Sequence, residues 1–271
     1  MAPIHAEICR RVTLIVLILS CANLAPAAES RDLEEMIRIP AGVFLMGSDN
    51  GPEDERPQHK VNLAEFFIDR NQVSNGQFAR FLNSAGPAGK GGEKYYDVDD
   101  SDARIHRRDG KWLADAGHEK RPVVEVSWFG AAAYCGWLGK RLPSEAEWEK
   151  AARGTDGRKY PWGNDQPDAN RAHYNAGWND LRDVGNFPTG ASPYGVLDMA
   201  GNGWEWVSSA YLPYPYNAAD GREDSAREQV RGTRGGGHDS SAAELTATHR
   251  GRHVSRNYRS GHHNIGFRCA R

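Results

Sequence analysis

The segment PVVEVSWFGAAAYCGWLGKRLPSEAEWEKAARG, residues 122–154, decides the fold because it encodes two short helices with clear boundaries. Ser127 is of the residue type that caps helix N-termini, and the apolar face that follows carries Ala131, Tyr134, Cys135 and Leu138. Ser144 opens the second helix, and Glu147, three residues later, completes a capping box. Trp148, Ala151 and Ala152 are expected to face inward, and Gly154 ends that helix.

Further elements precede this segment. Ser74 and Gln77 form a second capping box, and the helix that they open has an apolar face of Phe78, Phe81 and Leu82 and ends at Gly86. Residues 36–47, MIRIPAGVFLMG, predict a strand, a turn and a strand, and Lys60 to Ile68 predict one further strand.

Residues 86–120 are polar and rich in glycine, with an aspartate run at 97–102, so we expect a long surface insertion. A metal-binding acidic loop is the alternative. A solvated loop is preferred because the carboxylates lack the spacing of a known cation loop.

Composition excludes some function classes. The 271 residues carry a formal charge of −2, which favours neither a nucleic-acid binder nor an acidic tail. Apolar residues make up 39%, enough for a core, while 30 glycines and 14 prolines predict much loop. After Glu244 there are arginines and no acidic residue, so the C-terminus either attracts an anion or forms salt bridges with acids elsewhere in the fold.

The N-terminus resembles a targeting segment. Arg10 and Arg11 precede a short apolar run, and Ala25-Pro26-Ala27 offers a cleavage site. We therefore expect a signal peptide over 1–27, a linker over 28–34, one domain over 35–271 and a periplasmic or otherwise exported protein. The alternative is a lipoprotein tethered to a membrane through Cys21.

An exported chain can form disulfides. Outside the signal region only Cys135 and Cys269 remain, an even pair that closes a long loop if joined. Two buried free thiols are the alternative.

The sequence has no Walker loop, dinucleotide-binding glycine pattern, HExxH or CxxC. It has instead an ordered set of signatures: RIPAGVFLMGS (38–48), residues 122–154, YPWGN (160–164), YGVLDMAGNGWEW (194–206), RGG (234–236) and GFRCA (266–270). This set closely resembles the sulfatase-modifying factor family, which includes the formylglycine-generating enzyme. The resemblance implies an α+β fold related to C-type lectins, with little regular secondary structure and often with calcium. It also joins Cys135 to Cys269.

The family's aerobic enzymes hold copper between two cysteines that follow an Arg-Gly-Gly-Ser motif. Ser240 and Leu245 stand at the matching positions here, and neither supplies the thiolate that copper(I) requires. A second family disulfide is also absent, since Ala152 and Arg250 stand in its place. The resemblance therefore implies the family scaffold without its copper-thiolate chemistry.

The resemblance places calcium at Asn202 and Glu205, whose oxygens are the hard ligands that this ion takes. A second site would use Asn170 and Asp180. The alternative makes Asn202 a turn former and Glu205 the partner of a buried arginine. Iron or another metal is conceivable through five C-terminal histidines, although surface positions are preferred for them: His238, His249, His253, His262 and His263.

The family cleft is expected against Trp206 and the Arg-Gly-Gly loop. Its candidate lining residues are Trp206, His238, Asp239, Ser240, Arg250, Arg252 and Tyr258. Arginines there would suit a carboxylate, phosphate or sulfate. No nucleophile–base pair is recognisable, so catalytic residues stay unassigned.

Two function classes follow. The first, which we favour here, is an exported oxidoreductase-like enzyme that modifies a small molecule or peptide. The arginines suggest that this ligand is anionic. The second is a non-catalytic, lectin-like module that binds a ligand or a protein. Sulfatase activation is disfavoured because the cysteine pair is missing.

Overall fold

Three helices form where the capping signals predict them: α1 (Asn75–Ala85), α2 (Trp128–Trp137) and α3 (Glu145–Arg153). Both predicted capping boxes, at the starts of α1 and α3, are present in the computed structural model. Gly86 and Gly154 follow these two helices with φ of 78° and 68°, a conformation that favours glycine at a helix end. The structure describes residues 35–251 and 257–271. The predictions on the signal segment, Cys21, Arg252 and His253 lie outside these residues.

The N-terminal strands form two small antiparallel sheets. β1 (Met36–Ile39) pairs with β4 (Phe66–Asp69), and β2 (Gly42–Met46) pairs with β3 (His59–Leu63). The predicted strand over Lys60 to Ile68 is therefore wrong as a single element. The exposed pair Ala64 and Glu65 interrupts it, and its two halves belong to different sheets.

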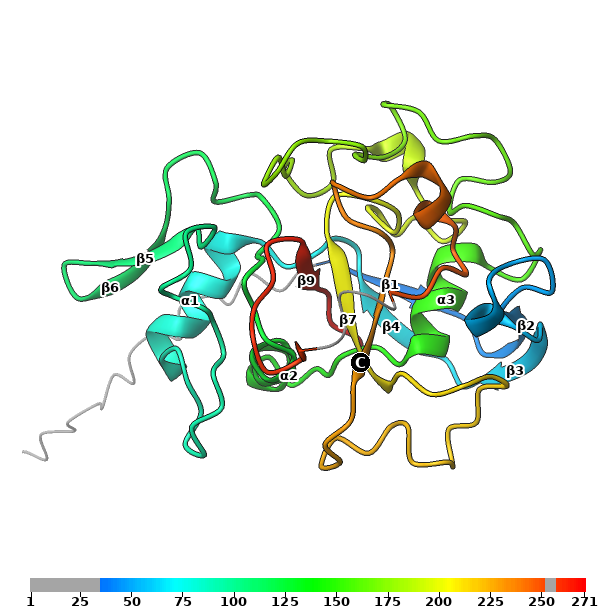
Figure 1. Ribbon diagram of the computed structural model, residues 1–271, viewed down its shortest axis with the longest axis horizontal. Helices are drawn as coiled ribbons and strands as arrows, with labels where there is room; N and C mark the ends of the chain where they lie inside the picture. The colour runs from blue at the N-terminus through cyan, green and yellow to red at the C-terminus, as the bar shows by residue number, and fades with distance from the viewer. Residues whose placement is uncertain (1–34, 252–256) are drawn as a thin grey trace, which may run out of the picture. The chain divides into compact units, whose positions relative to one another are not determined.

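A three-stranded sheet lies between α2 and α3, as Figure 1 shows. Its middle strand, β7 (Trp204–Ala210), is antiparallel to β8 (Arg231–Arg234) and parallel to β9 (Ile265–Phe267). The GNGWEW turn therefore leads directly into the central strand of the domain, and the Arg-Gly-Gly motif leaves the neighbouring strand at the same end.

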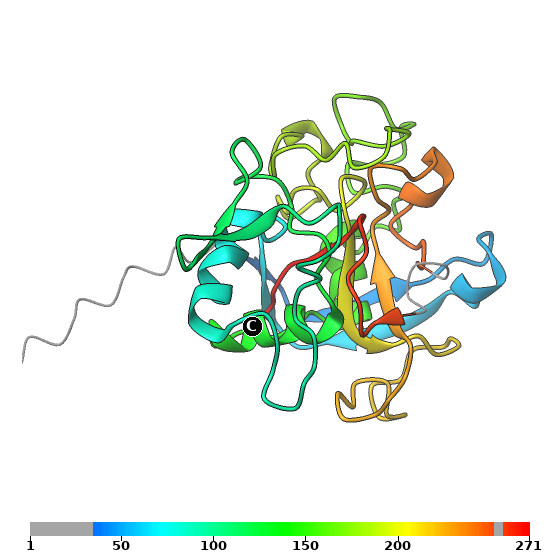
Figure 2. The ribbon, with the colours of Figure 1, turned by 60° about the vertical axis from the view of Figure 1, so that its left-hand side comes forward.

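The segment 86–120 is more structured than an insertion of loop alone. It contains a hairpin of β5 (Ile105–Arg108) and β6 (Lys111–Ala114), which lies beside α1 in Figure 2. The Asn83 side chain of α1 exchanges two hydrogen bonds with the backbone of Trp112. Tyr96 and Ile105 are almost completely buried, so part of this segment belongs to the core.

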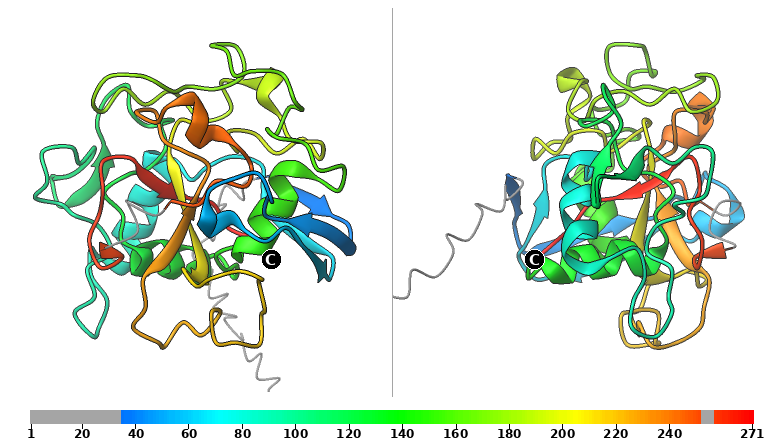
Figure 3. Two further views of the ribbon diagram at one scale, coloured as in Figure 1. Left: turned by 45° about the vertical axis from the view of Figure 1, so that its right-hand side comes forward. Right: turned by 90° about the vertical axis from the view of Figure 1, so that its left-hand side faces the viewer.

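The remaining described chain is mostly turns, as the two views of Figure 3 show. Short 3₁₀ turns occur at Glu53–Glu55 (η1), Pro188–Gly190 (η2) and Ala242–Leu245 (η3). Small sheets, three short helices and long loops confirm the α+β class with little regular secondary structure.

Aromatic packing and one disulfide hold the helices to the central sheet. Phe78 of α1 and Tyr134 of α2 stack with ring centroids 5.6 Å apart, and both contact the ring of Phe267. Cys135 and Cys269 are joined, which confirms the predicted pairing and ties α2 to the C-terminus. Within the described residues, no helix has both the length and the apolarity needed to cross a bilayer.

Candidate functional site

A cavity of about 350 Å³ opens beside the first residue of β7. Its wall includes Asp54, Trp204, Asp239, Glu244, His249 and Asn264. These residues come from η1, β7, the loop after β8, η3 and the turn before β9. We call this cavity the cleft. The 3₁₀ turn η1, the start of β7 and the turn before β9 are far apart in sequence, and only the folded chain brings them together.

Close backbone approach shapes the cleft around Trp204. A Cβ atom on Gly237 would lie 3.0 Å from the indole Cδ1 atom, and one on Gly251 would lie 3.0 Å from Cζ3. Glycine is therefore needed at both positions for the indole to fit. Among the described residues, no group accepts the Trp204 indole N–H, whereas the indoles of Trp128, Trp148 and Trp206 each donate a hydrogen bond to the protein.

Asp239 is an anchored anion at the mouth of the cleft. Its carboxylate lies 3.3 Å from His263 Nε2 and accepts from Asn264 Nδ2 at 3.1 Å. The hydrogen bond from His263, and after it the one from Asn264, lowers the pKa of Asp239 to about 2. Asp239 is therefore ionised at any pH at which the protein would work.

Asn264 presents an unused acceptor. Its Nδ2 atom is engaged by Asp239, but its Oδ1 atom is buried and has no hydrogen-bond partner among the described residues. A buried polar atom without a partner is costly unless a ligand or water completes it. The side-chain oxygen of Asn264 is thus an acceptor without a described partner, in a residue that lines the cleft.

The charge of the cleft is negative. Three carboxylates line it, those of Asp54, Asp239 and Glu244. The Tyr211 hydroxyl donates a hydrogen bond to the Asp54 carboxylate, and the Glu244 carboxylate accepts one from the backbone N–H of Ser241. Both carboxylates are therefore held in place. Such a lining offers many acceptors and favours a positively charged or donor-rich ligand.

Arg250 lines the cleft, but four of its five N–H donors are already used within the protein. Its Nε and Nη2 atoms bind Glu145 at 2.7 and 3.0 Å, and its remaining bonds go to the backbone carbonyls of Asp54 and Leu212. The rings of Tyr211 and Tyr214 lie 4.2 and 4.3 Å from the guanidinium carbon. This differs from the expectation that Arg250 would meet an anionic ligand, because a buried acid already neutralises it.

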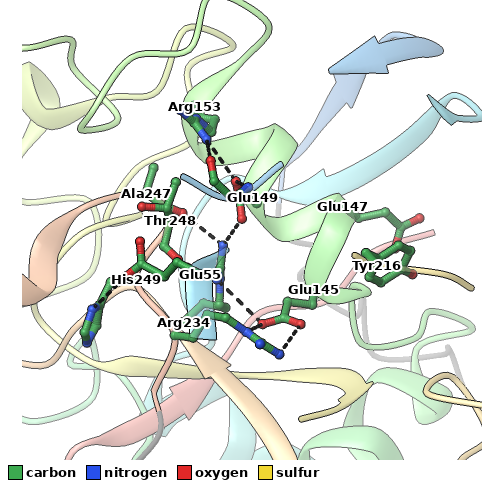
Figure 4. Close-up of polar contacts among 12 residues, drawn as sticks. Glu55, Glu145, Glu147, Glu149, Arg153, Tyr216, Arg234, Ala247, Thr248 and His249 are labelled. Atoms are coloured by element: carbon green, nitrogen blue, oxygen red, sulfur yellow. Dashed lines mark hydrogen bonds and ion pairs between the residues drawn. The ribbon is translucent and has the colours of Figure 1, made fainter. Parts of the chain in front are cut away.

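Buried ion pairs on the inner face of α3 form the support beneath the cleft (Figure 4). Glu149 binds Arg234 and also accepts from Arg153 at 3.1 Å. Glu145 lies 3.6 Å from Arg234 and shares its carboxylate with Arg250. Of the arginines after Glu244, Arg250 pairs with an acid of α3, and Arg259 and Arg268 pair with Glu228 and Glu205, which agrees with the salt-bridge alternative.

Three predicted cleft residues lie elsewhere. Trp206 is fully buried and donates to the backbone of Val126, so Trp204 takes the place expected for it. His238 is fully buried, and its ring nitrogens contact the backbones of Asn179 and Asn202. Tyr258 packs in the core against Phe129. Ser240, by contrast, does line the cleft, where its hydroxyl accepts from Gly237.

The described histidines do not converge on a metal. His249 contacts Glu55 at 3.2 Å, His262 contacts the backbone of Asn257, and His263 contacts Asp239. Burial lowers the pKa of both His238 and His262, which favours neutral, structural imidazoles. In the described part of the chain, the one group of three acidic, cysteine or histidine ligands is purely carboxylate and contains no histidine.

The two positions matching the copper-binding cysteines have different roles. Leu245 is fully buried in a small cluster with Tyr160, and Ser240 is hydrogen-bonded at the cleft. Both cysteines of the described chain are consumed by the disulfide. No thiolate is therefore available beside the cleft among the described residues.

The hydrogen bonds that the Glu205 carboxylate accepts leave no room for a calcium ion. Glu205 receives two hydrogen bonds from Arg268 at 2.7 Å, one from Trp148 and one from Gln72. These four donors use the lone pairs that a cation would need. The Asn202 amide is equally occupied, because both of its atoms bond the backbone of Arg182. The alternative reading, a turn former and a buried arginine's partner, describes this pair.

Asn170 and Asp180 also have other partners. The Asp180 carboxylate lies 3.1 Å from Arg182 and 3.6 Å from His173, and Asn170 accepts from Thr189 through its backbone carbonyl. Asp180 is therefore engaged by other groups, whereas the described contacts of Asn170 are made by its backbone. Their assignment to calcium stays a prediction.

Five residues of the cleft wall were not predicted to line it: Asp54, Trp204, Glu244, His249 and Asn264. Trp204 and Trp206 stand two residues apart in the GNGWEW turn, so the sequence could not say which of the two indoles faces the cleft. Asn264 precedes β9 without a motif of its own, and Asp54 lies far away in the N-terminal half.

Known proteins resemble this chain over most of its length. The family described as "Sulfatase-modifying factor enzyme 1-like domain" matches residues 22–271. The serine/threonine-protein kinase pkn1 of Chlamydia caviae is 39% identical over 88% of this chain, which spans only 38% of that kinase. The formylglycine-generating enzyme of Streptomyces coelicolor is 32% identical, with 93% of each chain covered.

A solved structure agrees with the fold. PvdO from Pseudomonas aeruginosa superposes with a TM-score of 0.66 at 29% identity, over 88% of this chain and 94% of PvdO.

Proposed function

The chain belongs to the sulfatase-modifying factor family, which includes the formylglycine-generating enzymes, and from this premise we propose that its cleft binds the cationic group of a small molecule or peptide. The proposed ligand group is an ammonium or a guanidinium. The cleft would bind it without copper-thiolate chemistry, as a ligand-binding member of the family.

The carrying observation is the unpartnered Oδ1 atom of Asn264, whose Nδ2 atom binds the ionised carboxylate of Asp239. An N–H donor of a cationic ligand would satisfy the first and neutralise the second. Hydrogen bonds to charged groups contribute about 1.5–3 kcal/mol each, more than those between neutral groups. The closed pair of Arg250 and Glu145 removes the cation that would otherwise favour an anion.

The test is calorimetry with ligand pairs of nearly the same shape, one of which carries the positive charge and the other not. A tripeptide containing arginine should bind at least about tenfold more tightly than its citrulline counterpart, a difference of about 1.4 kcal/mol. Asp239→Asn should abolish this preference, while the exposed Asp99→Asn should retain it. Equal binding of both peptides, or tighter binding of a carboxylate ligand, would refute the proposal.

A second candidate function is an oxidoreductase-like modification of the same ligand. Two carboxylate–histidine contacts at the cleft, His249 with Glu55 and His263 with Asp239, favour it because such pairs can move protons. Oxygen consumption by the protein purified from its host, in the presence of a bound basic ligand, would support it. Conversion of a sulfatase-motif cysteine peptide to the aldehyde would instead support sulfatase activation, which we do not expect.

We also propose that the protein is exported. The apolar run and cleavage site within residues 1–27 support secretion, and Cys21 supports a lipid tether as the alternative. The mass of the mature protein, recovered from a fractionated host, separates the two, because a tethered form would carry lipid on Cys21.

A further inference from the structure

Three carboxylates meet at the base of the long loop between α1 and α2. Oxygen atoms of Asp100, Asp102 and Glu125 all lie within 4.8 Å of one another. Two oxygens bound to one calcium ion at 2.3–2.6 Å are at most about 5 Å apart, so the spacing matches ligands around a single ion. Asp102 and Asp100 come from the aspartate run, and Glu125 comes from the segment before α2.

Glu125 is the decisive member of this group. It is 3% exposed, and its carboxylate has neither a hydrogen bond nor an ion pair with any residue that the structure describes. Its backbone, by contrast, is fixed: the N–H donates to His262 and the carbonyl accepts from Asp97. A buried carboxylate aimed at two further carboxylates, without a donor, requires a positive partner or a proton.

The two aspartates are already oriented. Asp102 accepts from the indole of Trp178 and from the amide of Asn179, both at 2.9 Å, and Asp100 accepts from the backbone N–H of Asp102 at 2.8 Å. A carboxylate has about four acceptor sites, so each retains lone pairs for a further ligand. The lysine of the same loop, Lys94, pairs with Asp97 and leaves this group alone.

We propose that Asp100, Asp102 and Glu125 form a binding site for a divalent cation of the calcium class. All three ligands are hard oxygens, and no histidine or cysteine joins them among the described residues, which disfavours zinc, copper and iron. Asp100 is exposed, so water can reach the ion and complete its coordination. The site is separate from Asn202, Glu205, Asn170 and Asp180.

The site has a direct connection to the cleft. Trp178, which donates to Asp102, stacks on the ring of His263 with centroids 3.7 Å apart. His263 in turn contacts Asp239. A cation that fixes Asp102 would therefore hold this indole, which is 69% exposed, against the wall of the cleft.

Binding of calcium chloride to the full chain, purified with chelator and then dialysed, tests the proposal by calorimetry. Terbium luminescence excited through tryptophan gives a second readout, because the Trp178 indole contacts a ligand. We expect one ion per chain, and at least a tenfold loss of affinity in Glu125→Gln and Asp102→Asn. Asp99→Asn, an exposed carboxylate of the same loop, should bind as the wild type does.

Asp100→Asn guards against a folding artefact, because its side chain is on the surface. This variant should also lose at least tenfold in affinity while keeping the wild-type circular dichroism spectrum. Absence of calcium binding by the wild type, retention of affinity in all three ligand variants, or tighter binding of zinc than of calcium would overturn the proposal. These results do not depend on what the cleft binds.

Discussion

Arg250 donates to both carboxylate oxygens of Glu145, at 2.7 and 3.0 Å, and neither side chain is more than 1% exposed. The pair spans 105 positions of sequence and joins the C-terminal segment to the first turn of α3. Its consequence for function is that the arginine nearest the cleft is already neutralised.

Removing one partner of this pair should be costly. Arg250→Met would leave Glu145 buried with only the 3.6 Å contact to Arg234, and the loss of unfolding free energy should be about 3–5 kcal/mol. Urea denaturation measures it. The control is Arg38→Met, which breaks the exposed pair with Glu65 and should leave the midpoint unchanged. Equal effects of the two substitutions would contradict the account.

The disulfide should make a large contribution to stability. Cys135 and Cys269 are 134 residues apart, and the chain-entropy model gives about 4–5 kcal/mol for a loop of this size. The double substitution to alanine should lower the unfolding free energy by that amount, and dithiothreitol should then have no further effect. A double variant as stable as the oxidised wild type would show that the bond contributes nothing.

Asp198 should make stability depend on pH. Burial is the main cause that raises its pKa from 3.8 to about 6, so the folded state holds this proton more tightly than the unfolded state. Its contribution to stability is therefore complete below pH 4 and is lost as the pH rises through 6, by about 3 kcal/mol.

Asp198→Asn cannot titrate and tolerates the left-handed backbone of this position, where φ is 54°. The stability of the wild type relative to this variant should fall between pH 4 and pH 7, as measured by urea denaturation at each pH. The exposed Asp183→Asn serves as the control and should keep the wild-type profile. A constant difference between wild type and Asp198→Asn would rule out the raised pKa.

Two glycines should respond to alanine in opposite directions. A Cβ on Gly251 would lie 1.8 Å from Thr233 Oγ1 and press on the Trp204 indole, so Gly251→Ala should cost about 1–3 kcal/mol and weaken ligand binding. Gly136, on an exposed face of α2, has open space at its Cβ, so Gly136→Ala should stabilise by up to about 1 kcal/mol. Thermal unfolding of both variants gives the two signs directly.

The local elements could be predicted because their signals are local. Ser74 with Gln77 and Ser144 with Glu147 specify helix starts by contacts three residues apart, and both boxes form. The pairing of strands could not be predicted in this way. The MIRIPAGVFLMG stretch predicts a strand, a turn and a strand, but not that β1 and β2 pair with β4 and β3 instead of with each other.

The cleft was only partly predictable, for a physical reason. Asp239 and Ser240 follow the Arg-Gly-Gly motif and do line it, but the destination of Arg250 depends on an acid 105 positions away. The composition already showed the excess of C-terminal arginines. It could not show that Glu145 of α3 would neutralise Arg250, which only the tertiary structure decides.

The most direct test of the central claim is a nuclear magnetic resonance titration of the ¹⁵N-labelled protein with N-acetyl-arginine amide and with its citrulline analogue. If the cleft binds cationic groups, the indole resonance of Trp204 and the side-chain amide resonance of Asn264 will move with the arginine compound and stay in place with citrulline. Equal shifts with both compounds, or shifts that leave Trp204 and Asn264 unaffected, would contradict a cleft for cationic groups.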